Sequence, residues 1–141
     1  LKIQDKLTGP LIARIIYSRP QKGGRLIFGD LIEYGKVWRL GANEATEMEF
    51  YKDVRINNTK IKKGRYTLYC IPYADKWTII INKETGSFRY DAKKDLLRVD
   101  IALQKQTETT EEFVMAFEKS STGAVLIIAW ENVKLNLPIV F

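Results

Sequence analysis

Histidine is absent from this sequence, and only one cysteine, Cys70, is present. Without histidine, Ser-His-Asp and Cys-His catalysis are excluded, and so is zinc bound through imidazole. A single cysteine excludes an intrachain disulfide, and a cysteine inside a strand pattern is predicted to be a small core residue. The spacing of the acidic residues matches no calcium loop, so the sequence predicts no metal site and no cofactor.

Long apolar runs are missing as well. The longest, Ala124 to Trp130, has seven residues, whereas a membrane-spanning helix needs about 20. It is predicted to be a buried, central strand, and no membrane span is expected. The chain opens with LKIQDKL, which is neither a signal peptide nor an intact start, so we expect that an upstream segment has been removed.

The net charge is +6, and a basic chain raises the question of nucleic-acid binding. The basic residues are spread along predicted strands, opposite apolar faces. One dense cluster, Lys60, Lys62, Lys63 and Arg65, surrounds a predicted turn. None of the common nucleic-acid recognition motifs occurs, so no nucleic-acid partner is predicted.

Alternating apolar residues separated by turn signals predict about nine strands and little helix. The Asn57-Asn58 pair suits a two-residue hairpin turn, because asparagine tolerates positive φ. This spacing predicts an all-β, single-domain antiparallel β-sandwich over residues 1–141, with a barrel-like variant as the second choice. The predicted strands cover residues 11–17, 46–51, a hairpin over 54–61, 64–71, 77–82, 96–103, 112–118, 124–130 and 133–137.

The stretch from Tyr17 to Thr46 departs from this regular pattern. It holds five of the nine glycines, which allow sharp turns and close approach of a ligand to the backbone. Arginines suit carboxylate or phosphate groups, and aromatic rings offer flat apolar faces. These residue types are those of a small polar pocket. The candidate ligand-binding residues are Arg19, Arg25, Tyr34, Trp38, Arg39, Asn43 and Glu44.

The motifs YSRP, GRLIFG and YGKVWRLGANEAT, followed by KKGRYTLYCIP, KWTIIINK and LIIAWEN, span nearly the whole chain. In these motifs the chain resembles an uncharacterised bacterial family, domain of unknown function 2911. The resemblance implies an all-β domain, typically exported by bacteria of the Bacteroidetes group, and hence a periplasmic or secreted location. It implies no activity. Family members usually carry a Trp-Gly pair in the loop that here runs from Lys83 to Tyr90, so either this loop is shorter or a few residues are absent from the sequence between Thr85 and Gly86.

Three interpretations of the central stretch stay open. The favoured one is a non-enzymatic binding or interaction module for a carbohydrate or another small polar ligand. The alternative is a hydrolase that uses Glu44 with a second carboxylate from Glu33, Asp30 or Glu131, since glycoside hydrolysis needs two carboxyl groups.

The third interpretation is a purely structural domain. In it, Trp38 belongs to the core and Glu44 pairs with Arg39 or Arg19. Residues 133–137 then form an edge strand that pairs with a partner. The oligomeric state is not predicted.

Overall fold

The computed structural model describes residues 2–6, 12–41, 45–85 and 89–141 as an all-β protein. Its only helical segment in these ranges is a short 3₁₀ helix, η1 (Ala92–Lys94). The strands are β1 (Lys2–Lys6), β2 (Ala13–Ser18), β3 (Thr46–Phe50), β4 (Val54–Ile56), β5 (Thr59–Ile61), β6 (Gly64–Pro72), β7 (Lys76–Asn82), β8 (Asp95–Ala102), β9 (Gln104–Lys119) and β10 (Gly123–Val140).

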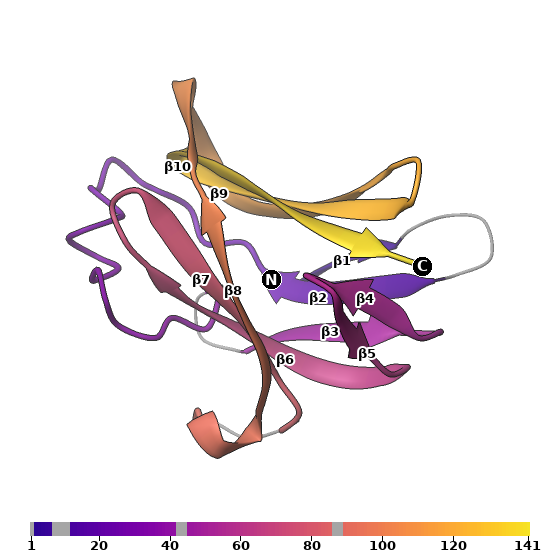
Figure 1. Cartoon of the computed structure of the whole chain (residues 1–141). Helices are drawn as coiled ribbons and strands as arrows, with labels where there is room; N and C mark the ends of the chain where they lie inside the picture. Colours follow the sequence, from indigo (N-terminus) through magenta and orange to yellow (C-terminus); the bar gives the residue numbers. More distant parts are fainter. Residues whose placement is uncertain (1, 7–11, 42–44, 86–88) are drawn as a thin grey trace.

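The strands form two antiparallel sheets that face each other (Figure 1). The larger sheet has the order β1-β2-β3-β6-β7-β8, and the smaller has the order β5-β4-β10-β9. Asn57 and Asn58 both have positive φ, 50° and 63°, in the turn between β4 and β5, as the sequence predicted. The predicted all-β antiparallel sandwich is therefore confirmed.

The core lies between the two sheets, because alternate side chains of each strand point inward. In β7, for example, Trp77, Ile79 and Ile81 are fully buried and face the apolar side chains of β10. Residues from both sheets and from the connecting loop belong to one contiguous cluster. Cys70 lies in it, and burial raises the pKa of its thiol well above the usual value. The prediction of a core cysteine is confirmed.

The last strand, β10, differs from its prediction. The sequence predicted two separate strands, with residues 133–137 as an edge or half-exposed strand. The structure has one run, Gly123–Val140, placed between β4 and β9, so the strand is not at a sheet edge. Residues 133–137 alternate between buried and half-buried positions, as a half-exposed strand does. A straight strand of 18 residues would span about 60 Å, yet the Phe141 N–H donates to the Thr122 carbonyl at 3.2 Å. The strand bends back at Glu131, whose φ is 54°.

Two further differences concern the ends of the larger sheet and of β9. The sequence did not predict β1, which pairs with β2 from Lys2 to Lys6. It also predicted only residues 112–118 of β9, which begins at Gln104. The polar segment from Gln104 to Glu111 lacks an apolar face, so hydrophobic alternation could not reveal it.

Candidate functional site

The loop between β2 and β3 closes one end of the sandwich with two aromatic side chains. Phe28 packs against Trp77 of the larger sheet with ring centroids 5.0 Å apart. Trp38 stacks on Trp130 of the smaller sheet at 6.0 Å and contacts the edge of Phe113 at 5.3 Å. Because these rings come from both sheets, the loop is fastened to the core at two points.

Trp38 is a core residue and not an exposed ligand-stacking face. Its side chain is only 7% exposed, and its indole N–H donates to the Gly41 carbonyl at 3.0 Å. Its backbone exchanges two hydrogen bonds with Cys70, at 2.7 and 2.8 Å, and so extends the ladder of β6 beyond the start of β3. This placement matches the structural interpretation of Trp38.

Two of the candidate arginines bind parts of the protein itself. Arg19 forms an ion pair with Glu112 at 3.0 Å and donates to the Phe113 carbonyl at 3.4 Å. Arg25 folds back over its own turn and donates to the Lys22 and Gln21 carbonyls at 2.9 and 2.5 Å. Both guanidinium groups therefore satisfy backbone carbonyls that a surface loop would otherwise leave to water.

Glu131, a candidate second carboxylate for hydrolysis, is buried and holds the same loop. It accepts hydrogen bonds from the backbone N–H groups of Ile27 at 2.9 Å and Phe28 at 3.5 Å. Lys22 is its cationic neighbour at 3.9 Å. The carboxylate anchors the turn through charge-assisted hydrogen bonds, which are stronger than neutral ones.

Arg39 is half-buried and interacts with other groups of the protein, and its charge acts to lower the pKa of Tyr69. Burial is the larger influence and raises the pKa of that phenol. Asn43 and Glu44 lie outside the described residues. The predicted pairing of Glu44 with Arg39, and the hydrolase built on Glu44, therefore stay predictions.

Tyr34 is the candidate residue that remains accessible, with 46% of its surface exposed. Its ring lies over Gly29, where an added Cβ would stand 2.9 Å from the Tyr34 Cε2 atom. Gly29 also has a φ of 91°, which side chains other than glycine rarely adopt. The glycine therefore sets both the turn and the position of the tyrosine ring.

The tip of the loop, residues 30–38, lines an open pocket of about 310 Å³. Its charged side chains, Asp30, Glu33 and Lys36, form no hydrogen bond or ion pair with the described residues, in contrast to Arg19 and Arg25. The remaining lining residues are Leu31, Ile32, Val37 and Trp38.

Backbone hydrogen bonds hold this tip from within. Ile32 N–H donates to the Ile27 carbonyl at 2.8 Å, Gly29 N–H to the Ile32 carbonyl at 2.9 Å, and Gly35 N–H to the Pro72 carbonyl at 2.8 Å. The described tip contains turns and no helix. The pocket thus has a fixed backbone and free charged side chains, which can bind hydroxyl or ammonium groups.

The sequence predicted a site in this stretch, and of its candidate ligand-binding residues Trp38 lines this pocket. Asp30 and Glu33 were named as alternative second carboxylates of a hydrolase, and Lys36 was not predicted. The signal was their position beside Gly29 and Gly35, at the turns where side chains stay in solvent. Across the described parts of the chain, no cluster of acidic or cysteine side chains could hold a metal ion.

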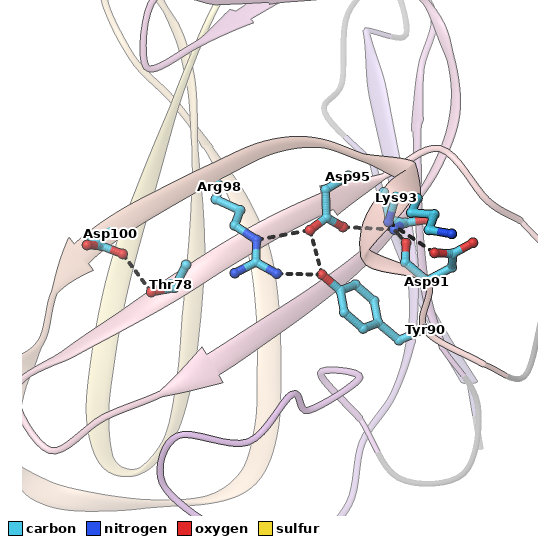
Figure 2. A network of polar contacts seen from close by, with 8 residues as sticks. Thr78, Tyr90, Asp91, Lys93, Asp95, Arg98 and Asp100 are labelled. Atoms are coloured by element: carbon cyan, nitrogen blue, oxygen red, sulfur yellow. Dashed lines mark hydrogen bonds and ion pairs between the residues drawn. The ribbon is translucent and has the colours of Figure 1, made fainter.

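A second polar network lies on the outer face of the larger sheet, beside β8 (Figure 2). Arg98 donates to Asp95 at 2.9 Å and to the Tyr90 hydroxyl at 2.7 Å, and Tyr90 donates to Asp95. Burial raises the pKa of Tyr90, and its hydrogen bond to Asp95 raises it further. Asn82 donates to the other Asp95 oxygen at 2.9 Å. The network fixes the segment before β8 to the sheet.

Fold and pocket together define a β-sandwich domain with a loop pocket closing one end. The chain belongs to the family described as "protein of unknown function (DUF2911)", which it matches over residues 2–139. Searches of curated proteins and of solved structures found no match. No helix in the described part of the chain is long and apolar enough to cross a membrane.

Proposed function

We propose that this domain is a non-enzymatic binding module for a carbohydrate or another small polyhydroxy ligand, held in the loop pocket. One observation carries the proposal: Asp30, Glu33 and Lys36 surround the pocket without a partner among the described residues. Nearby charged groups of the same loop are engaged internally.

The chemistry of the lining suits a sugar. Carboxylates accept hydrogen bonds from hydroxyl groups, and the Lys36 ammonium donates to ring or hydroxyl oxygens. Leu31 and Val37 add apolar surface for the C–H face of a sugar ring. Pockets that combine apolar walls with a few polar groups are typical of small-molecule sites.

The free groups support binding over the structural interpretation and narrow the hydrolase alternative. Glu131 is buried against backbone N–H groups, so the second carboxylate of a hydrolase would have to be Asp30 or Glu33. The structural interpretation describes Trp38, Arg19 and Arg25 well, but it leaves Asp30, Glu33 and Lys36 without a role. Tyr34, exposed beside Glu33 in the chain, is available to ligands that extend beyond the pocket.

The test is an NMR titration of the ¹⁵N-labelled domain with glucose, galactose, mannose and N-acetylglucosamine. Weak sugar binding has a Kd of about 1 mM, corresponding to about −4 kcal/mol. At least one sugar should shift the backbone amide signals of residues 29–38 in a saturable way.

The double variant Asp30→Asn/Glu33→Gln should lose at least about tenfold in affinity, which corresponds to about 1.4 kcal/mol. A matched control is Glu108→Gln/Glu118→Gln, which removes two exposed carboxylates from β9 and should bind as the parent does. The proposal fails if no sugar shifts these amides, or if both double variants bind equally well.

We further propose that the domain works in the periplasm or outside the cell, as the resemblance to exported bacterial proteins implies. Fractionation of a native bacterial host, with immunodetection of the chain, tests this location. Recovery in the cytoplasmic fraction alone would exclude it.

A further inference from the structure

The edge of the larger sheet at β8 is open. In the sheet order, β8 pairs with β7, and no strand of the described residues pairs with its other side. The strand is eight residues long, Asp95–Ala102, and contains neither proline nor glycine. Natural proteins usually protect such edges, because unpaired backbone N–H and C=O groups are a template for another strand.

Space for another strand exists beside this edge. Val99 to Ala102 line a groove of about 550 Å³ whose opposite wall includes Asn136, Leu137 and Pro138 of β10. The Asn136 side-chain oxygen is buried there and has no hydrogen-bond partner in the described structure. A buried acceptor without a donor is unfavourable.

The apolar side chains of β8 are also only partly covered by the rest of the described protein. Leu97, Val99 and Ile101 pack against the core but remain partly exposed, and Leu96 on the other face is 44% exposed. A neighbouring strand with the same alternation would continue both faces of the sheet.

The sequence of β8 is complementary to itself. In antiparallel pairing centred on Val99, Arg98 lies opposite Asp100 of a second copy, and Leu97 lies opposite its Ile101. Opposite charges stabilise directly facing positions, whereas like charges destabilise them. Shifting the register by two residues in either direction would place Arg98 opposite Arg98 or Asp100 opposite Asp100. Of these three registers, the one centred on Val99 avoids a like-charge pair and places two Arg98–Asp100 pairs directly opposite each other.

Both charged side chains are already held in place. Arg98 is oriented by Asp95 and Tyr90 (Figure 2), and Asp100 accepts hydrogen bonds from Thr78 at 2.6 Å and Lys76 at 3.1 Å. These contacts lower the pKa of Asp100, chiefly through the Thr78 hydrogen bond, so its carboxylate stays charged near neutral pH. Little further ordering of the side chains is needed for pairing.

We propose that two copies of this chain associate through antiparallel pairing of their β8 strands about a two-fold axis at Val99. The larger sheets then join into one continuous sheet across the dimer. The partner is a second copy because, in the register centred on Val99, Arg98 and Asp100 of each β8 lie opposite Asp100 and Arg98 of the other.

A disulfide across the axis tests this register. Directly opposite residues in an antiparallel pair have Cα atoms about 4.5–5.5 Å apart, within the range of a disulfide. The variant Val99→Cys should therefore form a covalent dimer on mild oxidation. The matched control Ala102→Cys should not, because its counterpart on the second copy lies about six residues, or 20 Å, away. Cys70 is fully buried, and the parent chain serves as its control.

Sedimentation equilibrium between about 1 and 100 µM tests the charge pairing. Arg98→Asp should weaken the dimer by about tenfold or more, since it creates two like-charge pairs. The double variant Arg98→Asp/Asp100→Arg should restore association, although it also disrupts the Arg98–Asp95 contact. Lys119→Asp, an equal change of charge on exposed β9, should leave the dimer intact.

Three results would overturn the proposal. They are a parent chain that stays monomeric throughout this range, a Val99→Cys variant that does not crosslink, and a double variant no better associated than Arg98→Asp. Circular dichroism establishes that each variant is folded. The dimer and the sugar site lie in different parts of the chain, so failure of one leaves the other standing.

Discussion

The base and the tip of the loop between β2 and β3 both involve charged side chains, but only those at the base bind other groups of the described protein. At its base, the Arg19 and Arg25 side chains are bound by carbonyls or carboxylates, and Glu131 of β10 binds the backbone of Ile27 and Phe28. At its tip, Asp30 and Glu33 reach solvent without a partner among the described residues. The difference shows that a charged residue in an irregular loop indicates a site only when its bonding capacity is unused.

The sharpest contrast is between two aromatic side chains that sequence reasoning treated alike, Trp38 and Tyr34. Trp38→Ala should lower the free energy of unfolding by about 3–5 kcal/mol, because it empties the centre of the aromatic cluster. Tyr34→Ala, at an exposed position, should change it by roughly 0.5–1 kcal/mol. Urea unfolding of both variants measures the difference. Equal losses would contradict the assignment of Trp38 to the core and Tyr34 to the surface.

Most strands could be predicted because their signals, the alternation of apolar residues and the residues of a turn, lie within a few consecutive positions. Residues 46–50 alternate between buried and half-buried positions, and Asn57-Asn58 forms a turn for which asparagine is suited. Residues 123–140 instead form one strand that bends at Glu131, where the sequence predicted two strands. Its carboxylate is buried because loop N–H groups more than 100 positions away meet it, and sequence spacing does not reveal such a contact.

The next largest effect should come from Glu131 itself. Glu131→Gln replaces one acceptor oxygen with an NH₂ group that faces backbone N–H donors, and it removes the charge beside Lys22. Leaving a buried donor unsatisfied costs about 1–3 kcal/mol, so the free energy of unfolding should fall by that amount. Thermal unfolding monitored by circular dichroism measures it. A loss below about 0.5 kcal/mol, the usual range of surface substitutions, would show that the carboxylate does not anchor the loop.

The candidate site was predictable as a region and not as a set of residues. Glycines at positions 29 and 35 marked the turns, and their positive φ values show why glycine is needed there. Which side chains then stay free depends on which backbone groups the rest of the fold leaves unpaired. The Arg25 side chain meets carbonyls of its own turn, and the Arg19 side chain meets Glu112 of β9. The partner of Arg19 is set by tertiary structure and those of Arg25 by the shape of its own turn, so the number of arginines overestimated the ligand-binding residues.

The smallest expected effect is also the most direct test of the central claim, that the loop tip keeps its carboxylates free. It is the change in unfolding free energy of Asp30→Asn/Glu33→Gln, measured beside Glu131→Gln under the same conditions. If the tip carboxylates are free, the double variant should stay within about 0.5 kcal/mol of the parent while Glu131→Gln loses about 1–3 kcal/mol. If the double variant loses as much as Glu131→Gln, Asp30 and Glu33 hold the fold together, and the distinction between the base and the tip of the loop is wrong.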